Sequence, residues 1–320
     1  MRVSLCNEGI SFSGSITVLQ WGSFYNYANL SGDVTVLEWG HFWNKGPVGK
    51  ISGGTISGQV DNDGTITGGT FSSRVENSGT ITNGTFSDHV ENTGKITNGA
   101  FSGVVENSGT ISGEITIAKG GSLNNHADGT ISGDITIAEY GSLNNNAGGT
   151  ISSGTFTVHG GMNNQGTITG SATFEILGVA ALTNDGTISG GSFTGRVTND
   201  GEITGGTFSG AEVYNKTSGK ITGGTFGNGM VVNNRGSIAD GDFRGATVTN
   251  YDDGTVTGGT FDKFTVATDE DGERTITITG AIDMDSANAL HPLTIGLDAV
   301  KSVTIAAGGS FDAGSTTVSW

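Results

Sequence analysis

Four successive copies of one repeat decide the fold: GKISGGTISGQVDND (49–63), GTITGGTFSSRVENS (64–78), GTITNGTFSDHVENT (79–93) and GKITNGAFSGVVENS (94–108). Each copy has fifteen residues and the form Gly-x-Ile-x-x-Gly-x-Phe/Ile-x-x-x-Val-x-Asn-x. A period this short is too small for a domain. It therefore predicts one turn of a structure that stacks copy upon copy.

Three apolar columns run through these copies, and each column repeats once per period. They are Ile66, Ile81, Ile96 and Ile111; Phe71, Phe86 and Phe101; and Val75, Val90 and Val105. The columns are four or five residues apart, which predicts three short strands per turn. One turn cannot bury these side chains alone, but stacked turns bury them continuously. The sequence therefore predicts an all-β, single-stranded parallel β-solenoid with turns of fifteen to twenty-one residues.

The same pattern extends beyond the regular copies, with the Ile column traced from Ile10 through Leu30 and Ile51 to Val256. We expect the extra residues of long turns to enter just before Gly-x-Ile, and Gly and Asn to fill corners that need positive φ. Handedness stays open, with right-handed winding favoured because left-handed solenoids usually keep a stricter turn length. Three sections are expected: long aromatic-rich turns at 1–50, a regular solenoid at 51–261, and irregular capping turns at 262–320.

The composition limits the partners that the chain can have. The 320 residues include 31 Asp plus Glu and 14 Lys plus Arg, so the net charge of −17 argues against nucleic acid and anionic membranes. Cys6 is the only cysteine, which excludes an internal disulfide. The sequence shows no run of membrane-spanning length and no signal peptide at its start. We expect either a cytoplasmic protein or, preferably, part of a longer secreted chain.

Two long turns near the start, SGSITVLQWGSFYNYAN (13–29) and SGDVTVLEWGHFWNKGP (31–47), align without gaps up to Asn26 and Asn44 and are rich in aromatic residues. The later turns SGEITIAKGGSLNN and SGDITIAEYGSLNN replace the Trp column by Gly and Tyr, so we expect this column to point outward. Exposed rings stack well on sugars, which makes this ladder a candidate glycan site. The alternative is that the rings cap the N-terminal end or pack on an upstream segment. The candidate residues are Trp21, Tyr25, Trp39 and Trp43.

Two polar columns accompany the apolar ones. Asn residues recur two positions before the Gly of Gly-x-Ile, and we expect their amides to form a structural ladder from turn to turn. The neighbouring row Asp61, Glu76, Glu91 and Glu106 is either a solvated acidic stripe, which we favour, or a calcium site. No metal or cofactor is therefore expected. The ladder residues singled out are Asn62, Asn77, Asn92, Asn107, Asn184 and Asn199.

Thr residues flank the Ile column and are expected to form two outward hydroxyl rows. This arrangement resembles the Thr-x-Thr face of insect-type β-solenoid antifreeze proteins, which implies ice binding as an alternative function. Thr is also a common outward residue of half-exposed strands, and Lys95 interrupts the rows. The residues of this alternative face are Thr65, Thr67, Thr80, Thr82, Thr167 and Thr169.

The GTITGGTFSGxVxN-type repeat resembles the Gly-rich β-solenoid repeats of bacterial adhesin-like cell-surface proteins, over most of residues 10–261. The resemblance implies an extracellular or cell-surface setting and a glycan or protein partner. Scarce Arg, and His residues that share no column, give little support for the alternative of a polysaccharide-active β-helix enzyme. The sequence thus predicts a non-enzymatic structural or binding module, with glycan contact preferred and a pure spacer left open.

Overall fold

The computed structural model of the chain describes residues 4–46, 49–227, 229–251, 253–256, 258–266, 274–278, 281–284, 294–295, 300–305 and 310–312. The chain divides into two compact units, Met1–Met162 and Asn163–Trp320. These bounds differ from the expected sections 1–50, 51–261 and 262–320, which mark changes in repeat regularity. Each unit is a stack of parallel strands, and together the units hold about 14 solenoid turns. The predicted parallel β-solenoid is therefore confirmed.

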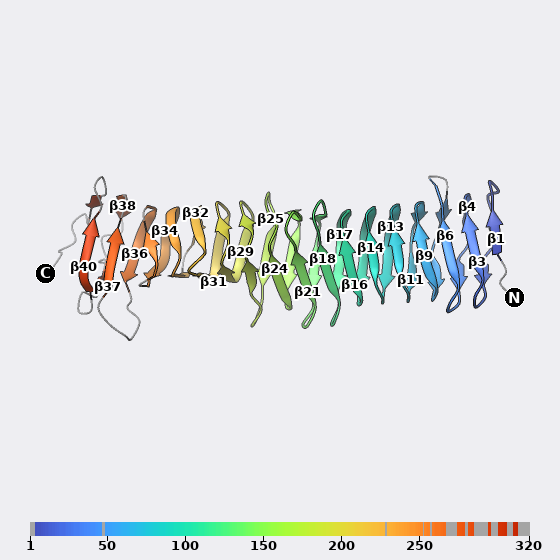
Figure 1. Cartoon of the computed structure of the whole chain (residues 1–320), viewed down its shortest axis with the longest axis horizontal. Coiled ribbons are helices and arrows are strands. Elements are labelled where there is room, and N and C mark those ends of the chain that lie inside the picture. The colour runs from blue at the N-terminus through green and yellow to red at the C-terminus, as the bar shows by residue number, and fades with distance from the viewer. Residues whose placement is uncertain are drawn as a thin grey trace. The chain divides into compact units, whose positions relative to one another are not determined.

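In the first unit each turn contributes three strand segments, which fall into three columns (Figure 1). The first column contains β4 (Asn29–Leu30), β7 (Lys50–Ile51), β10 (Thr65–Ile66), β19 (Thr130–Ser132) and β22 (Thr150–Ser153). The second contains β2 (Ile16–Val18), β5 (Val34–Val36), β8 (Gly54–Ile56), β11 (Gly69–Phe71), β20 (Ile135–Ile137) and β23 (Thr155–Val158). Three strands join these two columns: β13 (Thr80–Phe86), β15 (Lys95–Phe101) and β17 (Thr110–Ile117). The third contains β1 (Ser4–Asn7), β3 (Ser23–Asn26), β6 (His41–Asn44), β9 (Gln59–Asn62), β12 (Val75–Asn77), β14 (Val90–Asn92), β16 (Val104–Asn107), β18 (Ser122–Asn125) and β21 (Ser142–Asn145).

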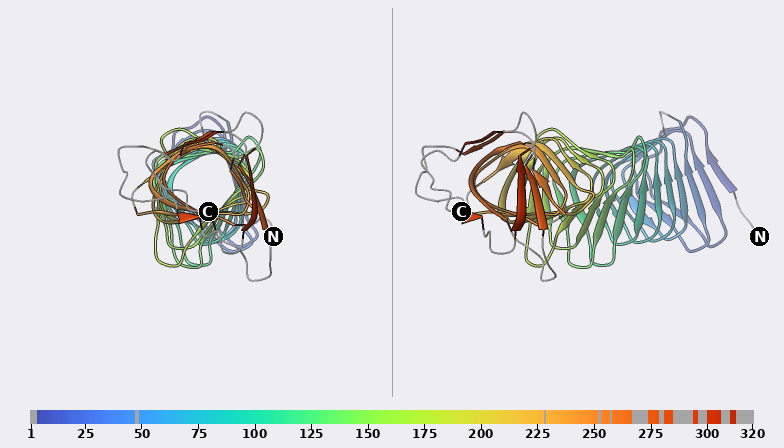
Figure 2. Two further views of the ribbon diagram at one scale, coloured as in Figure 1. Left: turned by 90° about the vertical axis from the view of Figure 1, so that its left-hand side faces the viewer. Right: turned by 60° about the vertical axis from the view of Figure 1, so that its left-hand side comes forward.

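The second unit repeats this pattern with more irregular joins, after β24 (Gly161–Asn164). Its strands in chain order are β25 (Thr167–Ile168), β26 (Thr173–Ile176), β27 (Leu182–Asn184), β28 (Thr187–Ile188), β29 (Ser192–Asn199), β30 (Glu202–Ile203), β31 (Thr207–Asn215), β32 (Lys220–Phe226), β33 (Val231–Asn234), β34 (Ser237–Asn250), β35 (Thr255–Val256), β36 (Thr260–Val266), β37 (Arg274–Ile278), β38 (Ala281–Met284), β39 (Thr294–Ile295), β40 (Val300–Ile305) and β41 (Ser310–Asp312). Within each unit, successive turns lie side by side (Figure 2).

Identical residue types pair from turn to turn, which explains the stacking. Ile66 pairs with Ile81, Phe71 with Phe86, and all are buried. The rings of Phe71 and Phe86 lie parallel at 4.9 Å between centroids. Each buried side chain thus meets its own kind above and below, and a narrow core is filled without a large hydrophobic layer.

The first turn departs from the predicted Ile column. Phe12, not Ile10, bridges to Leu30, and Ile10 is 70% exposed. The prediction for Ile10 is therefore wrong, because the Gly-x-Ile signature that marks the column elsewhere is missing around this residue. An apolar residue without the Gly-x-Ile signature does not fix the register of this turn.

The long turns also differ from expectation in where their extra residues lie. Between β15 and β17 the pairing shifts from Thr97–Ser112 to Gly99–Ile115, which adds one residue at the first corner. Phe101 pairs with Ile117 and Val104 with Ser122, which adds two residues at the second corner. Insertions therefore enter at more than the one corner predicted, because only the strands, not the corners, must stay in register.

The Gly of Gly-x-Ile is required by close approach rather than by positive φ. A Cβ on Gly79 would lie 2.2 Å from the carbonyl oxygen of Gly64, and one on Gly94 would lie 2.2 Å from that of Gly79. Neither residue is among those with positive φ. For these two glycines the turn-to-turn contact of the backbone is the physical reason, while the expected positive φ is found at other corner residues, among them Gly69, Asn83 and Asn98.

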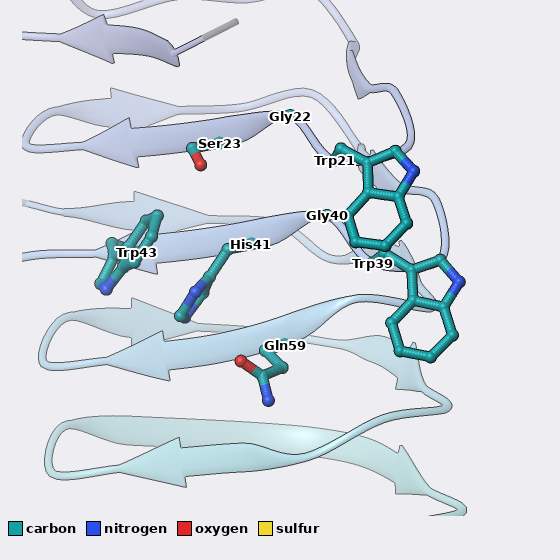
Figure 3. Close-up of a pocket in the computed structure, with 8 residues that line it drawn as sticks. All are labelled: Trp21, Gly22, Ser23, Trp39, Gly40, His41, Trp43 and Gln59. Atoms are coloured by element: carbon teal, nitrogen blue, oxygen red, sulfur yellow. The ribbon is translucent and has the colours of Figure 1, made fainter. Parts of the chain in front are cut away.

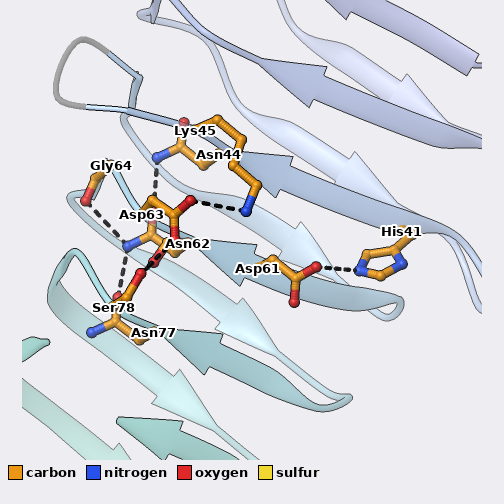
Figure 4. Close-up of polar contacts among 9 residues, drawn as sticks. All are labelled: His41, Asn44, Lys45, Asp61, Asn62, Asp63, Gly64, Asn77 and Ser78. Carbon is orange, nitrogen blue, oxygen red and sulfur yellow. Dashed lines mark hydrogen bonds and ion pairs between the residues drawn. The ribbon is translucent and has the colours of Figure 1, made fainter. Parts of the chain in front are cut away.

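A column of buried Asn side chains closes the corner after the third strand (Figure 4). Asn62 Nδ2 donates to Asn77 Oδ1 at 2.7 Å, and Asn77 Nδ2 donates to Asn92 Oδ1 at 2.7 Å. The second amide hydrogen of Asn62 points to the carbonyl of Gly64 at 3.2 Å. In each unit the ladder also takes in Asn residues of long turns, which stand farther from the next Gly: Asn26, Asn44, Asn125, Asn145, Asn215 and Asn250.

Candidate functional site: an aromatic groove on the first unit

The widened second corner places two tryptophans on the surface. Gly22 N donates to Leu19 O at 2.9 Å, and Gly40 N donates to Leu37 O at 3.0 Å, so each corner closes as a tight turn. Trp21 and Trp39 both have a φ of 64° in these turns. This left-handed conformation is uncommon for bulky residues, so the backbone carries strain at both positions. Such strain is often found at functional sites.

The two indoles form one exposed aromatic surface. Their ring centroids are 5.6 Å apart with planes 10° from parallel, and the side chains are 52% and 68% exposed. Figure 3 shows the rings of Trp21 and Trp39 one beneath the other at the corner, where they come from two successive turns of the stack. Phe24 and Phe42, three residues further on, are fully buried. The structure thus places the Trp column outward and the Phe column inward.

A second aromatic stack lies on the outer face of the third strands. Tyr25 of β3 and Trp43 of β6 are register partners, with centroids 4.3 Å apart and planes 1° from parallel. His41 lies two residues before Trp43 on the same face and stacks on it, with the two ring centroids 3.6 Å apart. Aromatic side chains therefore occupy both the corner and the adjoining face of the same two turns.

Between the two stacks lies a depression of about 300 Å³, here called the tryptophan groove (Figure 3). Its floor is a row of register partners, in which Ser23 pairs with His41 and His41 with Gln59. The side chains of Ser23 and Gln59 form no hydrogen bond within the described part of the chain. The groove is lined by Trp21, Gly22, Ser23, Trp39, Gly40, His41, Trp43 and Gln59.

Asp61 fixes the hydrogen-bonding state of the histidine in the groove. His41 Nε2 lies 3.0 Å from Asp61 Oδ2 (Figure 4). A carboxylate can only accept, so Nε2 is the nitrogen that carries the hydrogen. In the neutral ring, Nδ1 is then left as an acceptor, which suits a hydroxyl group of a ligand.

The acidic row continues the outer face of the third strands beyond Trp43. Asp61 follows Trp43 in the register, and Glu76, Glu91 and Glu106 follow Asp61. Each carboxylate has a cationic or imidazole partner, such as Arg74 Nη2 at 2.8 Å from Glu91 Oε1. Within the described residues, no group of three His, Cys, Asp or Glu side chains could hold a metal ion. The other contacts of this row are His41 with Asp61, Arg74 with Glu76, His89 with Glu91, and His126 with Glu106.

The Thr face proposed for ice is interrupted by lysines near Thr65 and Thr80, whereas Thr110, Thr130 and Thr150 form an unbroken run of register partners further along the first unit. Thr65 and Thr80 are register partners. In the strands on either side of this pair, Lys50 lies next to Thr65 and Lys95 lies next to Thr80. Thr67 Oγ1 donates to Ile51 O at 2.9 Å, so this hydroxyl is already engaged. Thr82 pairs with Thr97, while Thr167 and Thr169 belong to the second unit. Ice binding stays a prediction.

The structure brings Trp21, Trp39 and Trp43 together around the groove and places Tyr25 behind Trp43, outside the lining. Sequence reasoning missed the floor residues Ser23, His41 and Gln59. A usable signal existed for two of them: in the gapless alignment of the two long turns, Ser23 and His41 fall in one column between the Trp and Phe columns. Gln59 belongs to a compact turn and carries no such signal.

Comparisons with known proteins add little to the site. No family model matches the sequence, and no curated protein matches it. Among solved structures, the chain is similar to a crystal structure of a TibC-catalysed hyper-glycosylated TibA fragment. The identity is 14% and the TM-score 0.38, with 97% of this chain and 99% of that chain covered. In the described residues, no helix has the length and apolar character needed to cross a membrane.

Proposed function

We propose that this chain is a non-enzymatic, extracellular, adhesin-like structural module that binds a glycan in the tryptophan groove. The single observation that carries the proposal is the groove itself. Two exposed parallel indoles border it, a third ring lies opposite, and Ser23 and Gln59 on its floor lack partners among the described residues. Sugar rings offer apolar C–H faces to aromatic rings and hydroxyls to polar groups, so this combination suits them.

The alternatives have less support from the same contacts. An enzyme acting on polysaccharides needs carboxylates that are free to act on the substrate. Asp61, the carboxylate that contacts the groove residue His41, is instead engaged by that histidine at 3.0 Å. An ice-binding face needs unbroken hydroxyl rows, whereas Lys50 and Lys95 bracket Thr65 and Thr80.

Binding to a broad glycan panel tests the proposal, with the wild type beside the double variant Trp21→Gly/Trp39→Gly. Glycine is the matched replacement because it adopts a φ of 64° without strain, and Gly120 already stands at this corner position in a later turn. Each stacked ring contributes about 0.5–1.5 kcal/mol, so we expect the double variant to lose about ten-fold or more in affinity.

Tyr140→Gly is the control, since Tyr140 occupies the same corner position with a φ of 62° and is 76% exposed, but lies outside the groove. We expect this variant to bind as the wild type does. Binding that survives the loss of both indoles would place the site elsewhere. A wild-type protein that binds no glycan on the panel would overturn the proposed function.

A further inference from the structure

We infer that the tryptophan groove takes a neutral, linear glycan that lies across the strands, along the stacking direction, and contacts at least two consecutive sugar residues. This inference rests on the proposed function and specifies its ligand class and pose. It follows from the succession of groove residues over three turns, from their spacing and from the charges around them.

The direction of the ligand follows from the register. The floor residues Ser23, His41 and Gln59 come from three successive turns, on β3, β6 and β9. The wall residues Trp21 and Trp39 come from the first two of these turns. The groove therefore offers a polar side chain on its floor at each of three turns and an indole on its wall at two of them, so a ligand that extends in that direction meets a polar contact at each step.

The minimum length follows from the strand spacing. Neighbouring parallel strands are about 4.8 Å apart, so the backbone positions of Ser23 and Gln59 are separated by about 10 Å. A single pyranose ring is too short to contact both ends of this row while stacking on an indole. Two or more linked sugars can place one ring on Trp21 or Trp39 and reach the free amide of Gln59.

The charge preference follows from which groups are free. No Lys or Arg lines the groove. The charges of two cations on these turns are already paired, with Lys45 Nζ 2.9 Å from Asp63 and Arg74 Nη2 3.0 Å from Glu76. Asp61 lies on the same outer face as the floor, next to Trp43 in the register and bonded to His41, and the whole chain carries a net charge of −17. An anionic sugar would meet repulsion without a compensating cation, whereas neutral hydroxyls meet a serine, an amide and an imidazole acceptor.

Titration calorimetry on the full chain tests this inference with defined oligosaccharides. The probes are β-1,4-linked glucose, mannose, galactose and N-acetylglucosamine oligomers from monomer to hexamer, and glucuronate, mannuronate and galacturonate oligomers of matched length. We expect at least one neutral series to gain about ten-fold or more in affinity between monomer and trimer, and then to level off. We expect the uronates to bind at least about ten-fold more weakly at low salt, with the difference shrinking as salt is added.

Gln59→Ala probes the far end of the floor. Loss of one hydrogen bond predicts a decrease of about five-fold for the trimer and a smaller decrease for the dimer. Ser142→Ala is the control, because Ser142 lies in a third strand of a later turn and its hydroxyl donates to Ser122 Oγ at 3.0 Å.

The outcomes separate this inference from the proposed function. If affinity is already maximal with a monomer, or if uronates bind as tightly as neutral sugars, the inferred ligand class is wrong. When such binding is still lost in Trp21→Gly/Trp39→Gly, the groove remains a glycan site and the proposed function stands. If no series binds, the proposed function itself fails, and this inference fails with it.

Discussion

The turns around Trp21 and Trp39 and those around Gly120 and Tyr140 share one backbone but display different side chains. All four residues have left-handed φ values, 64°, 64°, 81° and 62°. Inward, both regions present an apolar residue and then an Asn, each fully buried: Phe24 and Asn26, Phe42 and Asn44, Leu123 and Asn125, Leu143 and Asn145. Outward, one region carries a pair of indoles and the other a glycine and a single tyrosine ring. The scaffold is therefore specified by inward columns, which leaves the outward corner free to carry function.

The largest effect is expected where the two regions are alike, in the Asn ladder. Asn44 Nδ2 donates to Asn62 Oδ1 at 2.7 Å and to Gly49 O at 3.0 Å, and Asn125 Nδ2 donates to Asn145 Oδ1 at 2.8 Å and to Gly129 O at 2.9 Å. Alanine at either position leaves several buried polar groups unpaired. We expect Asn44→Ala and Asn125→Ala each to lower the free energy of unfolding by about 3–5 kcal/mol.

Urea unfolding of both variants, followed by circular dichroism, measures this loss. Asn83→Gly is a suitable control, because Asn83 is exposed, has a φ of 60° and accepts one hydrogen bond, from Asn98 at 3.0 Å. It should change stability by less than about 1 kcal/mol. Clearly unequal losses in the two ladder variants would show that the two regions do not share one scaffold.

A smaller effect on stability is expected when the corner indoles are introduced into the second region. The double variant Gly120→Trp/Tyr140→Trp places indoles at the later corners. A side chain on Gly120 meets open space, so the cost is the backbone strain at a φ of 81°, about 1–2 kcal/mol. Tyr140 already bears this strain. Thermal unfolding should therefore show a folded protein with a modestly lower midpoint.

The same variant asks whether corner indoles suffice for binding, once its native groove is removed by Trp21→Gly/Trp39→Gly. The later floor carries Ser122 and Ser142, which bond to each other, and Asn124 replaces an aromatic residue on the adjoining face. We expect the transplanted corner to bind glycans at least about ten-fold more weakly than the native groove. Full recovery of affinity would mean that the floor residues do not contribute.

The fold was predictable because its signal is repeated. Each column of the solenoid appears many times, so the register of one turn is supported by its neighbours, and Ile66, Phe71 and Val75 lie where the period places them. Prediction failed where repetition failed. Ile10 stands outside the Gly-x-Ile pattern, and the corner insertions follow no period, because corners need only close the chain between strands.

The groove was predictable only in part, for a related reason. The Trp column is visible when the sequences of the two long turns are aligned. Its replacement by Gly and Tyr in later turns indicates an outward position. The floor residue Gln59 lies in a turn of different length, so only the three-dimensional register places it beside His41. The clash that makes Gly79 obligatory likewise depends on the distance between turns, which no single repeat reveals.

The smallest expected effect concerns the contact of Asp63 with Ser78 and Lys45 at a corner of the N-terminal turns. It is a pH dependence of the free energy of unfolding. The Ser78 hydroxyl, and then Lys45, donate to Asp63 and hold the pKa of this carboxyl below its ordinary value of 3.8 (Figure 4). A depressed folded pKa means that the stabilisation is present above the unfolded pKa and is lost as the pH falls through the folded pKa. Asp63 is partly exposed, so we expect Asp63→Asn to cost less than about 1 kcal/mol at neutral pH, with the difference from wild type beginning to shrink near about pH 4 and vanishing only below the folded pKa. Urea unfolding between neutral and acid pH measures this difference, and repeating it in a Ser78→Ala background should reduce it, since the main cause of the shift is then removed. A difference that stays constant down to acid pH would show that the Asp63 contact with Ser78 and Lys45 does not stabilise this corner electrostatically.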